Sequence, residues 1–301
     1  MFLPDRDEIY ELTEETRRHA AGSFVRLPNG FTHYELGNGY ISRLGDGSGT
    51  SDVVLIHGFS IPYFIYDPTF QFLTESGYRV LRYDLFGRGF SDRPRAAYNI
   101  ALFVQQLADL LDALRLAGPV NLIGLSMGGP IAAAFAVRYP ERVNKLTLID
   151  PAGARPITLS PVFRMAKIPL VAEAILSLVS SERLALNAAR DLFDPALVDH
   201  FKSSFRIQLQ YKGFKRAILS TIRNGMLGSF VEVYEALGKM DRRVLLFWGR
   251  QDATVPFEHS EILRRAMPRA QLHVVENCGH IPHYEKPDEV NPILLEYLRN
   301  P

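Results

Sequence analysis

Ser126 lies in a setting that favours nucleophilic chemistry. It is the centre of Gly-Leu-Ser-Met-Gly, between an apolar run and an alanine-rich stretch with helical spacing. A Gly-x-Ser-x-Gly pattern between a strand and a helix makes a sharp turn that lifts the serine hydroxyl above the sheet. Gly124 and Gly128 flank the serine because larger side chains would crowd this turn. The turn also aims the Met127 N–H and the positive end of the following helix at one point, so the pattern predicts a nucleophile beside an anion-stabilising donor.

A serine nucleophile needs a base, and the base needs a carboxylate to orient it, because a hydroxyl is a poor nucleophile at neutral pH. Two acids, Asp150 and Asp252, follow apolar runs that resemble buried strands. Two histidines, His280 and His283, follow the last such run. The carboxyl ends of parallel strands meet at one edge of a sheet, so all four residues are candidates to act with the serine. Strand-end placement by itself leaves the choice among them open.

The balance of charge argues against a nucleic-acid or anionic-membrane partner. Lys and Arg number 34 against 33 Asp and Glu, so the net charge is +1 and no strong field favours such partners. A small molecule is therefore the expected partner. The sequence has no metal-ligand spacing and no glycine-rich phosphate loop, so we expect no metal and no cofactor. Cys278 is the single cysteine, which rules out an internal disulfide.

The sequence predicts a cytoplasmic protein. Its N-terminus begins Met-Phe-Leu-Pro-Asp-Arg and continues with charged residues, unlike a secretory signal. The longest apolar segment, residues 168–179, is interrupted by Pro169 and Glu173 and is too short to span a bilayer. We therefore expect no stable membrane insertion, and nothing in the sequence indicates an oligomeric state.

Short apolar runs alternate with stretches of helical spacing along most of the chain. The expected strands are residues 52–56, 79–84, 120–125, 145–149, 244–248 and 272–275. The expected helices are residues 69–76, 101–116, 130–138, 258–266 and 287–298. Runs that are apolar throughout are typical of strands buried on both faces. Strands that alternate with helices favour an α/β fold with a mostly parallel, doubly wound sheet.

One long stretch departs from this alternation. Residues 153–229 show helical spacing, several prolines and no convincing strand. An insertion between sheet strands lies where open α/β sheets bind ligands. We predict that residues 153–229 form a helical cap and that residues 1–152 and 230–301 form the core domain.

The N-terminal region has its own pattern. Residues 8–20 combine charges with helical spacing, which predicts an exposed helix. Residues 32–36 and 40–44 are extended runs on either side of Gly-Asn-Gly, and Asn-Gly in that position favours a hairpin turn.

Together these motifs resemble those of the α/β-hydrolase family, over residues 32–297. The His-Gly-Phe sequence at residues 57–59 resembles the family's oxyanion loop, which implies that the Phe59 N–H is a second donor beside that of Met127. Two fixed donors aimed at a developing oxyanion would each lower the barrier by about 3 kcal/mol. The glycine-rich turn that begins at Asp84 also resembles a family turn, and we expect a structural role for it.

The resemblance also separates the rivals for acid and base. Asp252 lies in a Gly-x-x-Asp-x-x-x-Pro pattern that resembles the family's acid turn in full, although some members place the acid where Asp150 lies. His280 ends an Asn-Cys-Gly-His sequence that resembles the histidine loop, whereas His283 lacks this context. The chain order Ser…Asp…His is the one expected for the fold. The resemblance therefore implies a triad of Ser126, Asp252 and His280.

The type of nucleophile narrows the reaction. Haloalkane dehalogenases and epoxide hydrolases of this fold carry an aspartate where this chain has Ser126, so those classes are excluded. A serine with two oxyanion donors fits acyl transfer, and we expect hydrolysis of a small carboxylic ester with a short or medium acyl chain, or of a monoacylglycerol. The residues expected to line the substrate pocket are Ile61, Tyr63, Phe64, Leu125 and Ile281, with apolar cap residues that include Leu192, Phe193, Met226 and Leu227.

Two other functions remain alternatives. The first is a carbon–carbon bond hydrolase of ring-cleavage products, whose members commonly carry asparagine before the serine and tryptophan after the histidine. Here Leu125 and Ile281 occupy those positions, which disfavours this alternative. The second is a ligand receptor on a hydrolase scaffold, which would bind a small molecule with little turnover.

Overall fold

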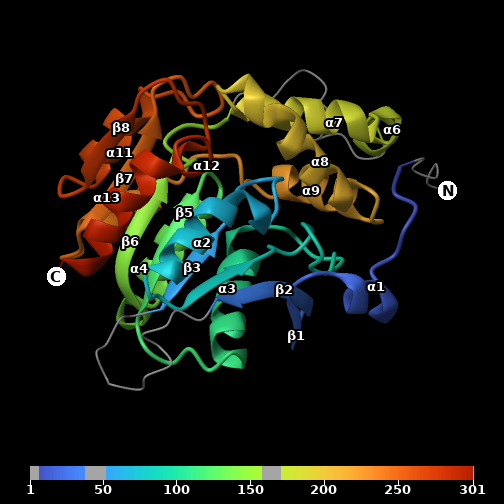
Figure 1. Cartoon of the computed structure of the whole chain (residues 1–301), viewed down its shortest axis with the longest axis horizontal. Helices are drawn as coiled ribbons and strands as arrows, with labels where there is room; N and C mark the ends of the chain where they lie inside the picture. The colour runs from blue at the N-terminus through green and yellow to red at the C-terminus, as the bar shows by residue number, and fades with distance from the viewer. Residues whose placement is uncertain (1–6, 38–51, 158–170, 301) are drawn as a thin grey trace.

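A mostly parallel sheet forms the centre of the molecule (Figure 1). The computed structural model describes residues 7–37, 52–157 and 171–300. Within them the sheet has eight strands in the order β1-β2-β4-β3-β5-β6-β7-β8. The strands are β1 (Ser23–Leu27), β2 (Gly30–Gly37), β3 (Val53–Ile56), β4 (Val80–Tyr83), β5 (Val120–Leu125), β6 (Val143–Ile149), β7 (Val244–Gly249) and β8 (Gln271–Val275). Strands β3 to β8 are parallel and β1 and β2 antiparallel, which confirms the predicted fold class.

Helices cover both faces of this sheet. They are α2 (Asp67–Glu75), α3 (Ile100–Ala113), α4 (Gly128–Arg138), α10 (Val231–Gly238), α11 (His259–Ala266), α12 (Pro282–Glu285) and α13 (Pro287–Arg299). Five of them match predicted helices, whereas α10 and α12 were not expected. Both are short, and α12 has only four residues, too few for a helical period to show.

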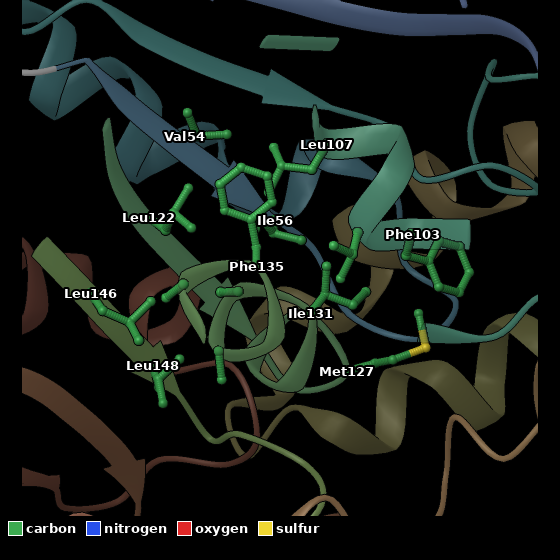
Figure 2. Packing of buried hydrophobic residues seen from close by; sticks show 14 of the residues in the cluster. Val54, Ile56, Phe103, Leu107, Leu122, Met127, Ile131, Phe135, Leu146 and Leu148 are labelled. Carbon is green, nitrogen blue, oxygen red and sulfur yellow. The ribbon is translucent and has the colours of Figure 1, made fainter. Parts of the chain in front are cut away.

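The core explains why the strands are apolar throughout. Val54 and Ile56 of β3 belong to one buried cluster with residues of α3 and α4, while Val53 and Leu55 belong to a second cluster with residues of α2 and α13. Successive side chains of a strand point to opposite faces, so a strand covered on both sides is apolar at every position. Figure 2 shows the first cluster, in which Phe135 lies among strand side chains.

The N-terminal region differs from its prediction in extent. The helix α1 covers only Glu14–His19, because the Thr13 hydroxyl accepts the Thr16 N–H and begins the helix there. The predicted extended run at residues 32–36 lies in β2, which pairs with β1 on one side and β4 on the other. The other predicted arm, residues 40–44, lies outside the described residues.

Helices fill the described part of the stretch predicted as a cap. They are α6 (Val171–Leu178), α7 (Ser181–Ala188), α8 (Val198–Leu209) and α9 (Phe214–Arg223), with the short 3-10 helices η5 (Ala189–Asp191) and η6 (Pro195–Leu197). In Figure 1, α7, α8 and α9 lie together beyond one end of the sheet. No strand occurs in the described residues between β6 and α10. The domain boundaries themselves stay a prediction.

None of the helices within the described ranges is long and apolar enough to cross a membrane.

Candidate active site

Ser126 occupies a strained turn between β5 and α4. Its φ of +52° lies in the left-handed region, a conformation that costs a residue with a side chain on the order of 1–3 kcal/mol. A Cβ on Gly124 would come within 2.4 Å of the Gly128 carbonyl oxygen, and a Cβ on Gly128 within 2.2 Å of the Ile56 carbonyl oxygen. Both glycines are therefore required by the turn, as the sequence predicts. The serine N–H donates to the Ile149 carbonyl at 2.9 Å, which fixes the turn to β6.

The loop after β3 lies against this serine. A Cβ on Gly58 would lie 3.2 Å from the Ser126 Cβ, so any larger residue would require the serine or the loop to shift by a few tenths of an ångström. His57 holds the loop as an anchor, because its Nε2 accepts the Leu85 N–H at 2.9 Å and its Nδ1 donates to the Gly58 carbonyl at 2.9 Å. Burial lowers the pKa of His57 to about 4, so the ring is neutral, as this pair of bonds requires.

Phe59 and Met127 are the two residues expected to supply oxyanion donors. Phe59 lines the same cavity as the serine, and the buried guanidinium of Arg88 donates from Nε to the Phe59 carbonyl at 2.7 Å. Met127 is the residue at which α4 begins, so its N–H is at the positive end of that helix. Neither N–H donates to another group within the described residues. Both are therefore free to bind an oxygen that becomes negative.

His280 and Asp252 form a buried pair beside the serine. Nδ1 of His280 lies 2.7 Å from Oδ2 of Asp252. Oδ1 of the same carboxylate accepts the N–H groups of Thr254 and Val255, both at 2.8 Å, so the acid turn holds the carboxylate in one orientation. Burial lowers the pKa of His280 and is the largest single cause. The charge and hydrogen bond of Asp252, with the charges of Asp191 and Glu285, together outweigh burial and raise the pKa to about 9.

Ser126 and His280 line the same cavity. No hydrogen bond joins their side chains in the described structure, and such bonds are often long before a substrate binds. The histidine has its Nδ1 occupied by Asp252, so its Nε2 is the nitrogen that can exchange a proton with a group in the cavity.

Asp150 lies in the same cluster as an additional acid. Carboxylate and imidazole atoms of Asp150, Asp252 and His280 lie within 4.8 Å of one another, and all three residues are buried. Oδ1 of Asp150 accepts the Gly249 N–H at 2.9 Å, while its Oδ2 has no partner. Burial and the neighbouring Asp252 charge raise the pKa of Asp150 well above its usual range, so we assign it the neutral form. The acid that bonds to the histidine is Asp252.

These three side chains are also the one group within the described residues whose donor atoms converge enough to hold a cation. Asp252 and His280 already bond to each other, and Asp150 is held neutral by burial. A metal ligand must be deprotonated and have a free lone pair, so this cluster suits proton transfer better than metal binding.

Within the described residues, His283, Cys278 and Asp84 are not among those that line the cavity beside the serine. His283 is fully buried and packs against Tyr66, with ring centroids 4.5 Å apart and ring planes tilted by 36°, and burial lowers its pKa to about 3. Cys278 is buried, and burial raises the pKa of its thiol, so it stays protonated. Asp84 accepts the N–H groups of Tyr63 and Phe90, which gives it the structural role expected from the sequence.

The cavity beside Ser126 has a volume of about 430 Å³ and a mainly apolar lining. Of the predicted pocket residues, Ile61 and Leu125 line it, as does Leu227. Tyr63, Phe64 and Ile281 are not among the described lining residues. Their side chains pack elsewhere: Tyr63 stacks on His33, Phe64 contacts Phe201 edge-on, and Ile281 lies in the second buried cluster.

Sequence reasoning missed most of the cap side of this cavity. Phe214, Ile218 and Ile222 line it from α9, four residues apart and therefore on one helical face. That spacing was readable in the sequence. Arg190 and Asp191 also line the cavity, and nothing in the sequence around them sets them apart.

Comparison with known proteins agrees with this architecture. The family model described as alpha/beta hydrolase fold matches residues 53–287. A 2-hydroxy-6-oxo-6-phenylhexa-2,4-dienoate hydrolase from Comamonas testosteroni is 32% identical, over 96% of this chain and 99% of its own. A protein of the same name from Burkholderia cepacia is 33% identical, over 75% and 78%. The solved structure of a meta-cleavage product hydrolase from Pseudomonas fluorescens IP01 is 26% identical with a TM-score of 0.74, covering 92% of this chain and 97% of its own.

Proposed function

This chain belongs to the alpha/beta hydrolase fold family, and from that premise we propose that it is a serine hydrolase that cleaves small carboxylic esters. The observation that carries the proposal is the shared cavity: Ser126, on a strained turn, faces the same apolar space as His280, whose other nitrogen is bound by Asp252. A nucleophile, a base and an orienting acid in this relation are the requirement for acyl transfer.

The reaction follows from the positions of these groups. The Ser126 oxygen attacks the ester carbonyl while His280 Nε2 takes the hydroxyl proton, and the carbonyl oxygen becomes an oxyanion. The N–H groups of Phe59 and Met127 stabilise that charge. His280 then gives its proton to the leaving alcohol, and an acyl group remains on Ser126. Water deprotonated by His280 releases the acid, and Asp252 stays ionised throughout.

The cavity supports a small apolar acyl group. Its 430 Å³ falls within the range of small-molecule sites, and its cap side is formed by Phe205, Phe214, Ile218 and Ile222. A short or medium acyl chain fits this lining by burial of apolar surface.

A carbon–carbon bond hydrolase is the second candidate. Two relatives that match three quarters or more of the chain carry the name of a dienoate hydrolase. A dienoate substrate has a carboxylate, and Arg190 lines the cavity without an ion-pair partner in the described residues. A guanidinium in that position is suited to bind a carboxylate. Leu125 and Ile281, which replace the expected asparagine and tryptophan, argue for the ester.

One experiment separates the candidates. Wild type and Ser126→Ala are compared on p-nitrophenyl esters from acetate to palmitate and on 2-hydroxy-6-oxo-6-phenylhexa-2,4-dienoate. Ester turnover with an optimum chain length, lost in Ser126→Ala, is expected. Faster turnover of the dienoate by wild type would favour carbon–carbon cleavage. Tight binding of either compound without turnover would favour the receptor alternative and contradict both enzymes.

A further inference from the structure

Residues 191–194 of the predicted cap, which we call the cap junction, contact the segment that carries His280. The Asp191 carbonyl accepts the His280 N–H at 2.8 Å. The Asp191 carboxylate accepts the Thr254 hydroxyl at 2.6 Å, and Thr254 in turn donates its N–H to Asp252. One residue of the cap is therefore bonded to the histidine loop and to the acid turn.

Glu285 of α12 joins the same two segments. Its Oε2 accepts the N–H groups of Phe193 and Asp194 in the cap junction, at 2.7 and 3.0 Å. Its Oε1 accepts the Gly279 N–H, the residue directly before the base, at 2.9 Å. The side chain is buried, so these bonds are not exchanged with bulk water. Each carboxylate oxygen thus holds a different segment of the chain.

The approach between the two segments is close. A Cβ on Gly279 would lie 2.4 Å from the Asp191 carbonyl oxygen and 2.9 Å from the Phe193 nitrogen. A displacement of the cap junction by a few tenths of an ångström must therefore move the histidine loop with it. Interiors packed this tightly transmit small shifts.

The cap junction is also in contact with the cavity. Asp191 and its neighbour Arg190 line it, together with Leu184 and Ala188 of α7 just before them. An acyl group that fills the cavity would press on this part of the cap. Asp191 therefore borders the cavity and also bonds to the loop of the base.

We propose that Glu285 is a positioning residue that couples the filling of the cavity to the placement of His280. The inference rests on the proposed function of Ser126 and His280 as nucleophile and base. An acyl group that supports the cap junction keeps the base in line with the serine, and it thereby raises kcat and not only affinity. A short acyl group leaves the cap junction unsupported, so kcat is raised less. Mispositioning by about 1 Å can lower a rate about a hundredfold, so small shifts are enough.

Glu285→Gln tests the coupling with little change of shape. A carboxylate offers two acceptor oxygens, whereas an amide offers one acceptor and one donor, so one of the two segments must lose its bond. We expect kcat for cavity-filling esters to fall about tenfold or more, kcat for acetate to fall much less, and KM to change less than twofold. Glu289→Gln, an exposed glutamate in the first turn of α13, is the matched control and should keep wild-type kinetics.

A second readout does not depend on an ester substrate. A fluorophosphonate reagent forms a bond between the serine oxygen and phosphorus with loss of fluoride, while the base takes the serine proton. The proposal expects slower labelling of Ser126 in Glu285→Gln than in wild type and in Glu289→Gln. Should Glu285→Gln fail to fold, Glu285→Asp, which keeps both acceptor oxygens on a shorter side chain, is measured in the same two assays.

The outcomes distinguish a failure of the proposed function from a failure of the proposed coupling. Wild type that neither cleaves esters nor reacts with the fluorophosphonate overturns the proposed function, and the coupling with it. A second result would overturn only the coupling. In that result the wild type reacts normally, and a folded Glu285 variant has either the wild-type labelling rate or an equal loss of kcat for every acyl length.

Discussion

Two buried histidine–aspartate pairs in this molecule have the same nitrogen–oxygen distance but differ in what surrounds the second ring nitrogen. Nδ1 of His280 lies 2.7 Å from Asp252, and Nδ1 of His33 lies 2.7 Å from Asp84. All four residues are buried. Each pair therefore has the hydrogen bond that is expected between a catalytic histidine and the acid that orients it.

The difference lies at the second ring nitrogen. Nε2 of His33 faces the Ala21 carbonyl at 2.6 Å, so both of its nitrogens meet acceptors and the ring must carry two protons. Burial lowers the pKa of His33, but the bonds to Asp84 outweigh it and raise the pKa. The second nitrogen of His280 instead faces a cavity that holds a serine. A base needs a ring nitrogen that has no other hydrogen-bond partner, so that it can take a proton from the reacting group.

The two pairs therefore predict opposite consequences of mutation. Changes beside His280 should lower activity with little loss of stability. Changes beside His33 should lower stability and leave the kcat of the folded protein unchanged. Each pair has a buried serine next to it, which allows matched variants.

The largest effect is expected from that pair of serines. Ser126→Ala should lower kcat roughly 10⁶-fold, the scale of nucleophile removal in a serine hydrolase. Its unfolding free energy should change by less than about 0.5 kcal/mol, because the hydroxyl has no hydrogen-bond partner among the residues that the structure describes. Ser91→Ala removes a hydroxyl that accepts the His33 N–H and donates to the Asp84 carbonyl, so it should lower the unfolding free energy by about 1–3 kcal/mol and leave kcat unchanged. Kinetics and urea unfolding of both variants check this, and equal effects would erase the distinction.

Asp252→Asn should lower kcat by up to roughly 10⁴-fold, the scale measured when the triad acid of a serine protease is changed to an amide. Asp150 limits this loss, because it lies in the same cluster and can ionise toward the histidine once the neighbouring charge is gone. The double variant Asp150→Asn/Asp252→Asn should therefore be about tenfold slower than Asp252→Asn alone, a difference of about 1.4 kcal/mol. Asp150→Asn alone serves as the control and should stay close to wild type. Equal rates for the single Asp252 variant and the double variant would show that Asp150 does not replace Asp252.

Asp84→Asn should lower the unfolding free energy by about 3–5 kcal/mol, because it leaves the buried charge of His33 without its partner. The folded fraction should cleave esters with the kcat of wild type. Chemical denaturation combined with titration of active sites measures both quantities. Loss of activity in fully folded Asp84→Asn would mean that this pair also takes part in the chemistry.

The pH profile gives the smallest and most direct test. The proposed mechanism requires the base form of His280 in the free enzyme, and the pKa of His280 is raised to about 9. The value of kcat/KM should therefore be low at acid pH, rise as the histidine loses its proton, and level off only above pH 9. A rise centred at or below 6.5 would show that Asp252 and the other acidic groups around His280 do not together outweigh burial.

The central strand β5 was predicted from the sequence far better than the edge strand β1, and the reason is physical. β5 was predicted to the residue because it is buried on both faces and so apolar at nearly every position. β1 was missed because Ser23–Leu27 is an edge strand in which four of five residues are not buried, so no such pattern arises. The turns at Ser126, Asp252 and His280 could be predicted from local motifs with fixed glycines.

The cavity could be predicted only in part, since its residues come from distant segments. Ile61 and Leu125 lie next to predicted turns and were found. Tyr63 was expected to face the substrate, but its ring packs against His33. Glu285 could not be identified at all, because it acts on backbone N–H groups more than ninety positions away, which have no sequence signature.

The division of the cavity wall between core and cap bears on how this enzyme could be re-engineered. The groups proposed for bond making lie on core turns, while Phe214, Ile218 and Ile222 on one face of α9 supply apolar wall. A library confined to those three positions would change which substrates fit while leaving the reactive groups untouched. A whole cap transplanted from a relative would need to retain residues 191–194, because the graft would otherwise remove the hydrogen bonds to Glu285 and to the His280 N–H.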